Sequence, residues 1–203
     1  MTPSTYLPLL LLIYLIAAIP TGVVLTRLMG LDDVRSKGSG NIGATNVYRV
    51  AGKLPGILTL AGDILKGFLP LLAVQLWLTP TPGQLGLAGV VAIIGHCYPI
   101  YLRFKGGKGV ATAFGIFLVL DPVALLGGCL AFLTAVALTR YISLGSTLAA
   151  IIVPLLTLLL GRPLPLLLGS CAIGALIVWR HRDNIKRLWT GTENRFGARP
   201  PAP

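Results

Sequence analysis

The densest group of chemically useful side chains lies in residues 36–49, which read Ser-Lys-Gly-Ser-Gly-Asn-Ile-Gly-Ala-Thr-Asn-Val-Tyr-Arg. Ser39, Thr45 and Asn46 offer hydrogen-bonding groups, and the guanidinium of Arg49 can bind an oxyanion through two parallel hydrogen bonds. Glycine has no Cβ, so the backbone N–H groups of Gly38–Gly43 can approach phosphate oxygens closely. The segment therefore predicts a site for a small anion such as phosphate. The alternative is an ordinary flexible loop.

A second segment, residues 96–112, contains the glycine-rich cationic turn Lys105–Gly109. This turn resembles part of a nucleotide-binding P-loop, but it lacks the earlier glycine and the Ser or Thr that must follow the lysine. It leads into a predicted helix at about Val110, where the amides and the helix dipole favour an anion. The alternative is a basic loop without a site. His96 fits a hydrogen-bonded interior histidine better than a catalyst.

The third segment is residues 180–195, beginning Arg-His-Arg-Asp-Asn-Ile-Lys-Arg-Leu. If it is helical, His181, Asn184 and Leu188 share one face and turn a titratable group and an amide toward the protein. The cations Arg182, Lys186 and Arg187 fit contact with anionic lipid head groups, each worth ~1 kcal/mol.

Long apolar runs separate these polar segments. The chain of 203 residues is 55% hydrophobic and 11% charged, whereas soluble domains carry about 25% charged residues. The sequence is therefore that of an integral membrane protein. Lys and Arg number 17 against 6 Asp and Glu, an excess that is typical of cytoplasmic loops in membrane proteins.

The apolar runs predict seven helices, at about residues 7–28 (with a kink at Pro20-Thr21-Gly22), 54–78, 85–102, 110–120, 123–138, 144–160 and 164–179. Asp121-Pro122 divides the run from 110 to 138, since proline ends or kinks a helix. If both parts cross, every basic cluster except Arg162 faces the cytoplasm. We therefore expect an all-α polytopic fold with the N-terminus outside and the C-terminus cytoplasmic. The alternative is five spans plus re-entrant segments.

Several polar residues lie within or beside these runs. Asp63 and Lys66 are costly in a span unless they form an ion pair or line a polar site, and the sequence leaves both readings open. Ser143 and Ser146 can cap a helix or form the lip of a site. The three cysteines, at 97, 129 and 171, fit small buried hydrophobes rather than a disulfide or metal set. Residues 1–203 are expected to form one membrane domain, with residues 197–203 a disordered tail.

Three motifs carry a resemblance to a known family. Ser-Lys-Gly-Ser-Gly-Asn-Ile-Gly-Ala-Thr-Asn at 36–46, Phe-Lys-Gly-Gly-Lys-Gly-Val-Ala-Thr at 104–112, and the His, Asn and Gly-x-Glu elements at 181–193 resemble the cytoplasmic motifs of the bacterial acyl-phosphate:glycerol-3-phosphate acyltransferases (the PlsY family). The likeness covers essentially the whole chain. Asp183, between His181 and Asn184, has no interpretation.

The resemblance implies a seven-helix enzyme of the bacterial inner membrane with its active site at the cytoplasmic face. It implies acyl transfer from acyl phosphate to the sn-1 hydroxyl of glycerol 3-phosphate, which gives lysophosphatidic acid and phosphate in the first step of phospholipid biosynthesis. It implies no metal or cofactor and no nucleic acid, contact with membrane lipid, and a soluble partner enzyme that makes acyl phosphate. The implied catalytic residues are Ser39, His181 and Asn184, and the implied substrate-binding residues are Lys37, Gly40, Asn41, Thr45, Asn46, Arg49, Lys105, Gly106, Gly107, Lys108, Ser146 and Glu193.

Two hypotheses about mechanism follow from this likeness and from the scarcity of carboxylates. Arg49 and Lys108 bind phosphate, and no protein residue is an obligatory base, so that substrate phosphate accepts the hydroxyl proton. His181 is then a hydrogen-bond partner or a proton relay. The rival function is a small transporter or channel for phosphate-bearing anions, but transporters usually show structural repeats and a site near mid-membrane, and the sequence shows neither.

Overall fold

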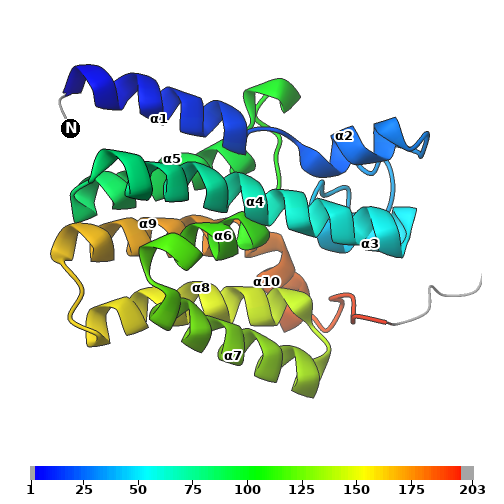
Figure 1. Cartoon of the computed structure of the whole chain (residues 1–203). Helices are drawn as coiled ribbons and strands as arrows, with labels where there is room; N and C mark the ends of the chain where they lie inside the picture. The colour runs from blue at the N-terminus through cyan, green and yellow to red at the C-terminus, as the bar shows by residue number, and fades with distance from the viewer. Residues whose placement is uncertain (1–2, 198–203) are drawn as a thin grey trace, which may run out of the picture.

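The computed structural model describes residues 3–197, and every regular element in that range is helical. Figure 1 shows the helices lying roughly along one direction, with α1 and α5 against α4, and α7 and α8 on the far side of α6 and α9. The elements are α1 (Pro3–Ala17), α2 (Thr21–Leu28), α3 (Ala44–Ala51), α4 (Lys53–Leu78), α5 (Pro82–Cys97), the 3₁₀ turn η1 (Ile100–Leu102), α6 (Val110–Leu120), α7 (Pro122–Thr139), α8 (Ile142–Leu159), α9 (Leu164–Arg180) and α10 (Arg182–Trp189).

All seven predicted apolar runs are helical, although not all are single straight helices. The first run is broken into α1 and α2, which are bent by 46° at the predicted Pro20 kink. Four of the described helices are long and apolar enough to cross a membrane, and up to six if each bent pair, α1 with α2 and α9 with α10, counts as one span. The remaining run, the fourth along the chain, is α6, which has only 11 residues, or about 16 Å at 1.5 Å per residue.

Asp121 and Pro122 separate α6 from α7, as the sequence predicts. Asp121 accepts a hydrogen bond from the N–H of Ala124 and so caps α7, while proline occupies the first position of the helix, where no N–H is needed. The buried Asp121 carboxylate also forms an ion pair of 2.9 Å with Arg162, from the connection between α8 and α9. Arg162 is the cation that departs from the predicted charge pattern, and this partner explains its position.

The segment predicted as a polar loop at residues 36–49 is only partly a loop. Its second half is α3, which begins after Gly43 and ends at Gly52, whose φ of 99° favours glycine. Val47 is fully buried in a small cluster with Val23, Val34 and Ile42. The apolar contacts of Val47 explain the helix, which the polar composition of the segment concealed.

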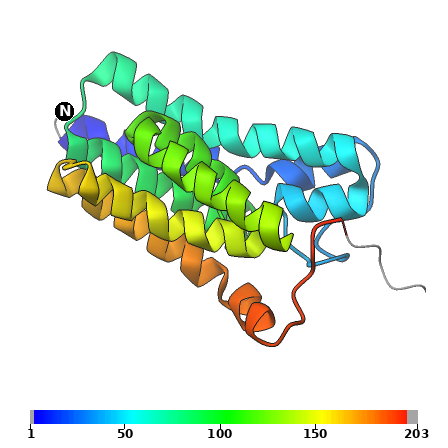
Figure 2. The ribbon, with the colours of Figure 1, turned by 90° about the horizontal axis from the view of Figure 1, so that it is seen from below.

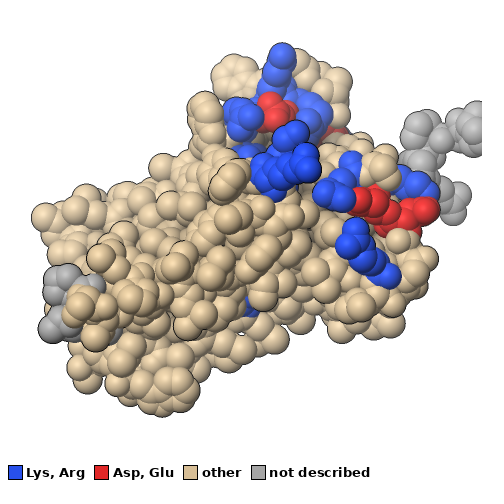
Figure 3. Space-filling view, turned by 90° about the horizontal axis from the view of Figure 1, so that it is seen from above, with Lys and Arg blue, Asp and Glu red and all other residues tan. Residues whose placement is uncertain are grey.

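Charged residues gather at one end of the molecule. Figure 3 shows Lys and Arg, with acidic residues among them, toward the end that carries α2 and α3, whereas the opposite end of that face is almost uncharged. The main buried core, which includes Leu71, Ile93, Ile116 and Ile173, lies between α4, α5, α6 and α9. Of the predicted buried cysteines only Cys97 is buried; Cys129 is intermediate and Cys171 exposed on an apolar helix. Residues 198–203 of the predicted tail lie outside the described residues.

Candidate active site

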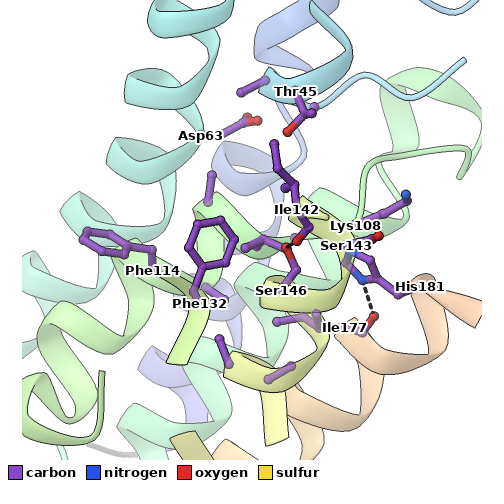
Figure 4. Close-up of a pocket in the computed structure, with 18 of the residues that line it drawn as sticks. Thr45, Asp63, Lys108, Phe114, Phe132, Ile142, Ser143, Ser146, Ile177 and His181 are labelled. Carbon is purple, nitrogen blue, oxygen red and sulfur yellow. Dashed lines mark hydrogen bonds between the residues drawn. The ribbon is translucent and has the colours of Figure 1, made fainter. Parts of the chain in front are cut away.

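A cavity of about 770 Å³ lies between α3 and α4 on one side and α6, α7, α8 and α9 on the other. Figure 4 shows Lys108 and His181 at one side of it and Phe114 and Phe132 at the other. One end is therefore polar and cationic, and the rest is mainly apolar. The polar end is lined by Ser39, Asn41, Thr45, Asn46, Arg49, Lys108, Ser143, Ser146, His181, Asn184, Arg187, Glu193 and Asn194.

A chain of hydrogen bonds orders the third polar segment around this end. Lys108 Nζ donates to Asn184 Oδ1 at 2.5 Å, and Asn184 Nδ2 donates to Glu193 Oε1 at 2.7 Å. Glu193 also accepts from Ser143 Oγ at 2.9 Å and from Arg187 Nε at 2.7 Å. The carboxylate thus joins α8, α10 and, through Asn184, the loop that carries Lys108. Glu193, implied to bind substrate, lines the cavity and accepts hydrogen bonds from three of the groups beside it.

The surroundings of this chain shift the pKa values of its charged members. Burial lowers the pKa of Lys108 to about 8, against a smaller raising effect of the Glu193 carboxylate. Burial alone would raise the pKa of Glu193, but hydrogen bonds from Asn184, Arg187 and Ser143 lower it overall. Lys108 is therefore a cation whose charge depends on pH near neutrality, while Glu193 stays ionised.

His181 lies at the junction of α9 and α10, where it is 3% exposed. Its Nδ1 is 2.8 Å from the carbonyl oxygen of Ile177. Since a carbonyl can only accept, Nδ1 carries a proton, and in the neutral ring Nε2 is left as the acceptor. His181 and Asn184 are both buried, as the sequence predicts, although α10 begins at Arg182 and His181 is its N-cap rather than part of the helix.

The first polar segment contributes Ser39, Thr45 and Arg49 to the cavity wall. Thr45 and Arg49 are one helical turn apart on α3, which places both on one face. None of the three side chains has a hydrogen bond or ion pair within residues 3–197 in this structure. Their bonding capacity is therefore not used by the described neighbours.

Asn46 has a different role, although it also touches the cavity. It is 2% exposed, its Nδ2 donates to the carbonyl oxygens of Val34 and Asn41, and its Oδ1 accepts from the N–H of Ser39. Asn41 Oδ1 likewise accepts from the N–H of Gly43. These amides fold the loop and thereby set the position of Ser39. Two other residues implied to bind substrate, Lys37 and Gly40, do not line the cavity, and Lys37 pairs with Asp32.

The sequence predicts that the glycine amides of the turn at residues 105–109 bind an anion, but the structure uses the amides of Gly106 and Gly107 for packing instead. The N–H groups of Gly106 and Gly107 donate to the carbonyl oxygens of Cys97 and His96, and Lys105, Gly106 and Gly107 do not line the cavity. A Cβ at Gly107 would lie 2.2 Å from His96 Nε2. The glycines are thus required by close packing on α5, and their amides are not available to an anion.

Arg180 holds the same turn from the other side, and the sequence did not single it out. Its guanidinium donates to the carbonyl oxygens of Gly107 at 3.0 Å and Gly106 at 2.8 Å, and it lies over the ring of Tyr98. The turn is therefore fixed between α5 and α9, and it delivers Lys108 to the cavity. The arginine sits next to His181 in a run of cations, so composition alone could not separate it from surface charge.

The sequence leaves open whether Asp63 and Lys66 form an ion pair or line a polar site, and the structure shows an ion pair whose acidic member also lines the cavity. The two side chains form a buried ion pair of 2.8 Å, and Lys66 Nζ donates to the carbonyl oxygen of Ile19 at the break between α1 and α2. Asp63 in addition lines the cavity. His96 is fully interior, with Nδ1 3.0 Å from Thr112 Oγ1, as expected of a hydrogen-bonded interior histidine.

Ser143 and Ser146 do not cap α8, because the N-cap is Tyr141 and lacks a side-chain cap bond. Ser143 binds Glu193, Ser146 Oγ donates to the carbonyl of Ile142, and both line the cavity. Arg187, which the sequence assigns to contact with lipid head groups, instead forms an ion pair of 2.7 Å with Glu193. Among residues 3–197, no group of three or more His, Cys, Asp or Glu side chains is placed to hold a metal ion.

The fold and the site define a helical membrane protein with a cavity that is polar and cationic at one end and mainly apolar elsewhere. Comparison with known proteins narrows this class. The family model described as glycerol-3-phosphate acyltransferase matches residues 7–191, and the chain belongs to that family. It is 53% identical to the glycerol-3-phosphate acyltransferase of Syntrophotalea carbinolica, over 96% of this chain and 100% of the relative. It is 50% identical to that of Geobacter sulfurreducens, over 91% of this chain and 94% of the relative.

Two crystal structures share the fold. Both are of PlsY, described as an integral membrane glycerol 3-phosphate acyltransferase, one in the glycerol 3-phosphate form and one in the lysophosphatidic acid form. Each is 43% identical to this chain and covers 95% of it, with 96% of the crystallised chain matched; the TM-scores are 0.89 and 0.87.

Proposed function

We propose that this protein transfers a fatty acyl group from acyl phosphate to the sn-1 hydroxyl of glycerol 3-phosphate. The products are 1-acyl-glycerol 3-phosphate and inorganic phosphate, and the reaction begins phospholipid biosynthesis. The names of the relatives and the two ligand forms of the crystallised relative support the acceptor and the lipid product. The observation that carries the proposal is the joining of Arg49 and Lys108 to a long apolar cavity in one site.

This arrangement suits the charge of the two substrates. Glycerol 3-phosphate, a phosphate monoester, carries about −1.5 to −2 near neutral pH. Acyl phosphate is a mixed anhydride with a similarly charged phosphate group, so the two substrates repel each other. Arg49 and Lys108 offset that repulsion in a partly desolvated site, where such interactions are stronger than in water. Holding both reactants together then lowers the barrier through proximity and orientation.

The acyl-transfer step needs little covalent chemistry from the protein. The glycerol hydroxyl oxygen attacks the acyl carbonyl carbon, the bond from that carbon to the phosphate oxygen breaks, and phosphate leaves with the electron pair. A substrate phosphate accepts the hydroxyl proton. Ser39, Thr45, His181 and Asn184 orient the head groups, and Ser146 contacts the donor.

We also propose how the protein is oriented in the membrane and where its donor substrate comes from. Residues 1–203 form one domain with seven crossings of the bacterial inner membrane, the N-terminus outside and the basic end in the cytoplasm, in accordance with the positive-inside tendency. A soluble enzyme supplies acyl phosphate from the cytoplasmic side. The gathering of cations at one end in Figure 3 supports this orientation.

The test is release of inorganic phosphate by the purified, detergent-solubilised protein. We expect release only when acyl phosphate and glycerol 3-phosphate are both present, with a stoichiometric lysophosphatidic acid product. Arg49→Ala should lower kcat/KM by about tenfold or more, since a charged hydrogen bond is worth about 1.5–3 kcal/mol. Lys37→Ala, which removes a cation outside the cavity, is the control. Phosphate release without glycerol 3-phosphate, or binding of phosphate without turnover, would contradict the proposal.

A further inference from the structure

The polar end of the cavity is open at the surface, and two parts of the chain frame the opening. A side chain that lines the cavity and is also exposed marks its rim. At the polar end these side chains are Ser39, Tyr48, Arg49, Asn194 and Phe196. The first three belong to α3 and the loop before it, and the last two belong to residues 193–197, here called the strap, which follow α10. The opening thus lies between α3 and the strap.

Hydrogen bonds fix the strap to α8, to α10 and to the corner between α7 and α8. The Glu193 carboxylate accepts its hydrogen bonds from side chains of α8 and α10. The N–H of Phe196 donates to the carbonyl oxygen of Arg140 at 2.7 Å, and Arg140 Nε donates to the carbonyl oxygen of Phe196 at 3.0 Å. Between them, Arg195 Nε donates to the hydroxyl of Tyr141 at 3.2 Å. The strap is therefore a fixed part of the rim.

The ring of Phe196 extends from the strap to α3. Its centroid is 6.0 Å from that of Tyr48, with the two ring planes inclined at 43°, and aromatic pairs attract each other at roughly 4.5–7 Å. Tyr48 is packed closely on α4, since a Cβ at Gly56 would lie 2.6 Å from Tyr48 Cβ. Figure 2 shows the strap, in red, running from α10 toward α3. Because both rings are held by their own segments, the pair forms a fixed contact across the opening.

This contact limits the space that remains outside the two cations of the site. Arg49 directly follows Tyr48 on α3, and Lys108 lines the same polar end. The reacting hydroxyl of the acceptor must face the inner, apolar part of the cavity, because the acyl donor is largely apolar. A longer acceptor adds atoms between that hydroxyl and its phosphate. Its phosphate is then displaced outward, past the cations and toward the rings of Tyr48 and Phe196.

We propose that the contact between Tyr48 and Phe196 sets the upper limit on the length of the acceptor and so determines specificity in this reaction. The class of acceptor that it admits is a short polyol phosphate with a primary hydroxyl, such as glycerol 3-phosphate. This inference rests on the proposed function, because it assumes acyl transfer to a phosphate-bearing acceptor. It assigns acceptor selectivity to two aromatic side chains, whereas the cations and amides of the site supply the binding of phosphate.

The test compares glycerol 3-phosphate with a longer acceptor, xylitol 5-phosphate, with palmitoyl phosphate as the donor. Phe196→Ala removes the ring but keeps the backbone hydrogen bonds to Arg140. We expect the ratio of kcat/KM for glycerol 3-phosphate to that for xylitol 5-phosphate to fall by about tenfold or more, since small changes in a pocket alter such ratios by roughly 10–200-fold. Tyr48→Ala should lower the ratio similarly. The double variant should add little, because both substitutions remove the same contact.

Two further variants serve as controls. Phe196→Tyr keeps the ring and should keep the wild-type ratio. Trp189→Ala removes an aromatic side chain that is 88% exposed and does not line the cavity, and it should also keep that ratio. A merely structural role of the strap would lower the activity toward both acceptors equally.

An unchanged ratio in Phe196→Ala, or a wild-type protein that uses both acceptors equally well, would overturn the assignment of specificity. So would a Phe196→Ala variant that does not acylate xylitol 5-phosphate. None of these results would affect the proposed function, which fails only if the wild-type protein does not turn over acyl phosphate with glycerol 3-phosphate.

Discussion

Lys108 is the cation of the site whose charge is most sensitive to its surroundings. Burial lowers its pKa to about 8, so the amine is protonated below this pH and increasingly neutral above it. The free-enzyme pKa governs kcat/KM. We therefore expect kcat/KM for glycerol 3-phosphate to fall above pH 8, approaching tenfold for each pH unit, as Lys108, which we propose binds phosphate, loses its charge.

The pH profile can be assigned to this residue by substitution. Lys108→Arg keeps a positive charge at all these pH values and should remove the fall above pH 8, even if it lowers the plateau. Lys105→Arg, in the same turn but outside the cavity, should leave the wild-type profile unchanged. A profile that stays flat from pH 7 to about 10 in the wild-type protein would be inconsistent with a low pKa for Lys108.

Substitution of His181 tests whether the hydroxyl proton of glycerol 3-phosphate goes to a substrate phosphate or to a base of the protein. Its Nδ1 is committed to the carbonyl of Ile177, which leaves Nε2 as the only ring atom that could take a proton. If substrate phosphate is the acceptor, His181→Ala removes a hydrogen bond and should lower kcat by about 5- to 150-fold, equivalent to roughly 1–3 kcal/mol. Added imidazole should then not restore the rate.

An obligatory base would give a different result. Its removal should abolish turnover while substrate binding persists, and imidazole should rescue the variant by occupying the space left. Glu193→Ala belongs to the same comparison, because Glu193 holds Asn184 and, through it, Lys108. We expect this variant to raise KM for glycerol 3-phosphate more than it lowers kcat, with Asp183→Ala, an exposed neighbour on α10, as its control.

At the scale of helices and loops, the ion pair of Asp121 with Arg162 ties the start of α7 to the connection between α8 and α9. Asp121 is 1% exposed and also caps α7. Asp121→Ala should therefore destabilise the protein by at least the loss of a cap, about 0.5–2 kcal/mol. A lower unfolding temperature in detergent, with KM for both substrates unchanged, is the expected result.

Asp121→Asn distinguishes the two contributions of this side chain. Asparagine can still accept the N–H of Ala124 but has no charge for Arg162, so its loss of stability should be smaller. A change of KM in either variant would show that this end of the bundle communicates with the site, contrary to the view that the pair is purely structural.

Apolar runs predict helices well, because burial in lipid or in the core requires them to satisfy their own backbone hydrogen bonds. The sequence also indicated His181, Asn184, Arg49 and Lys108, whose residue types have few other uses beside apolar spans. It could not separate glycines that pack from glycines that bind. Gly106 and Gly107 face His96 and Cys97, a contact between elements that motif spacing does not encode.

The same limit applies to polar side chains that fold loops. Asn46 appears in the sequence as a binding group, yet its amide is used by the carbonyls of Val34 and Asn41. Arg180 appears as one of several surface cations, yet it fixes the turn that carries Lys108. Both assignments depend on which segments the fold brings together. The sequence shows which polar groups are present, but only the tertiary structure shows which of them are not already bonded within the protein and so are available to a ligand.

On the scale of the whole molecule, the uneven distribution of charge predicts how the protein sits in its membrane. The basic end carries α3 and α10, and the connection between α4 and α5 lies at residues 79–81, which include no cation. With Cys97, Cys129 and Cys171 replaced by Ala, single cysteines can report each side. In intact cells, a membrane-impermeant maleimide should label Thr79→Cys but not Lys186→Cys, because basic segments remain in the cytoplasm.

Disrupting the membrane supplies the control for that experiment. Both positions are exposed in the folded protein, so in inverted membrane vesicles the pattern should reverse, and after solubilisation both should react. Labelling of Lys186→Cys in intact cells would place the cationic end of the cavity outside. Acyl phosphate made in the cytoplasm could not then meet Arg49 and Lys108 without crossing the bilayer, and the proposed direction of substrate supply would be wrong even if the purified protein were active.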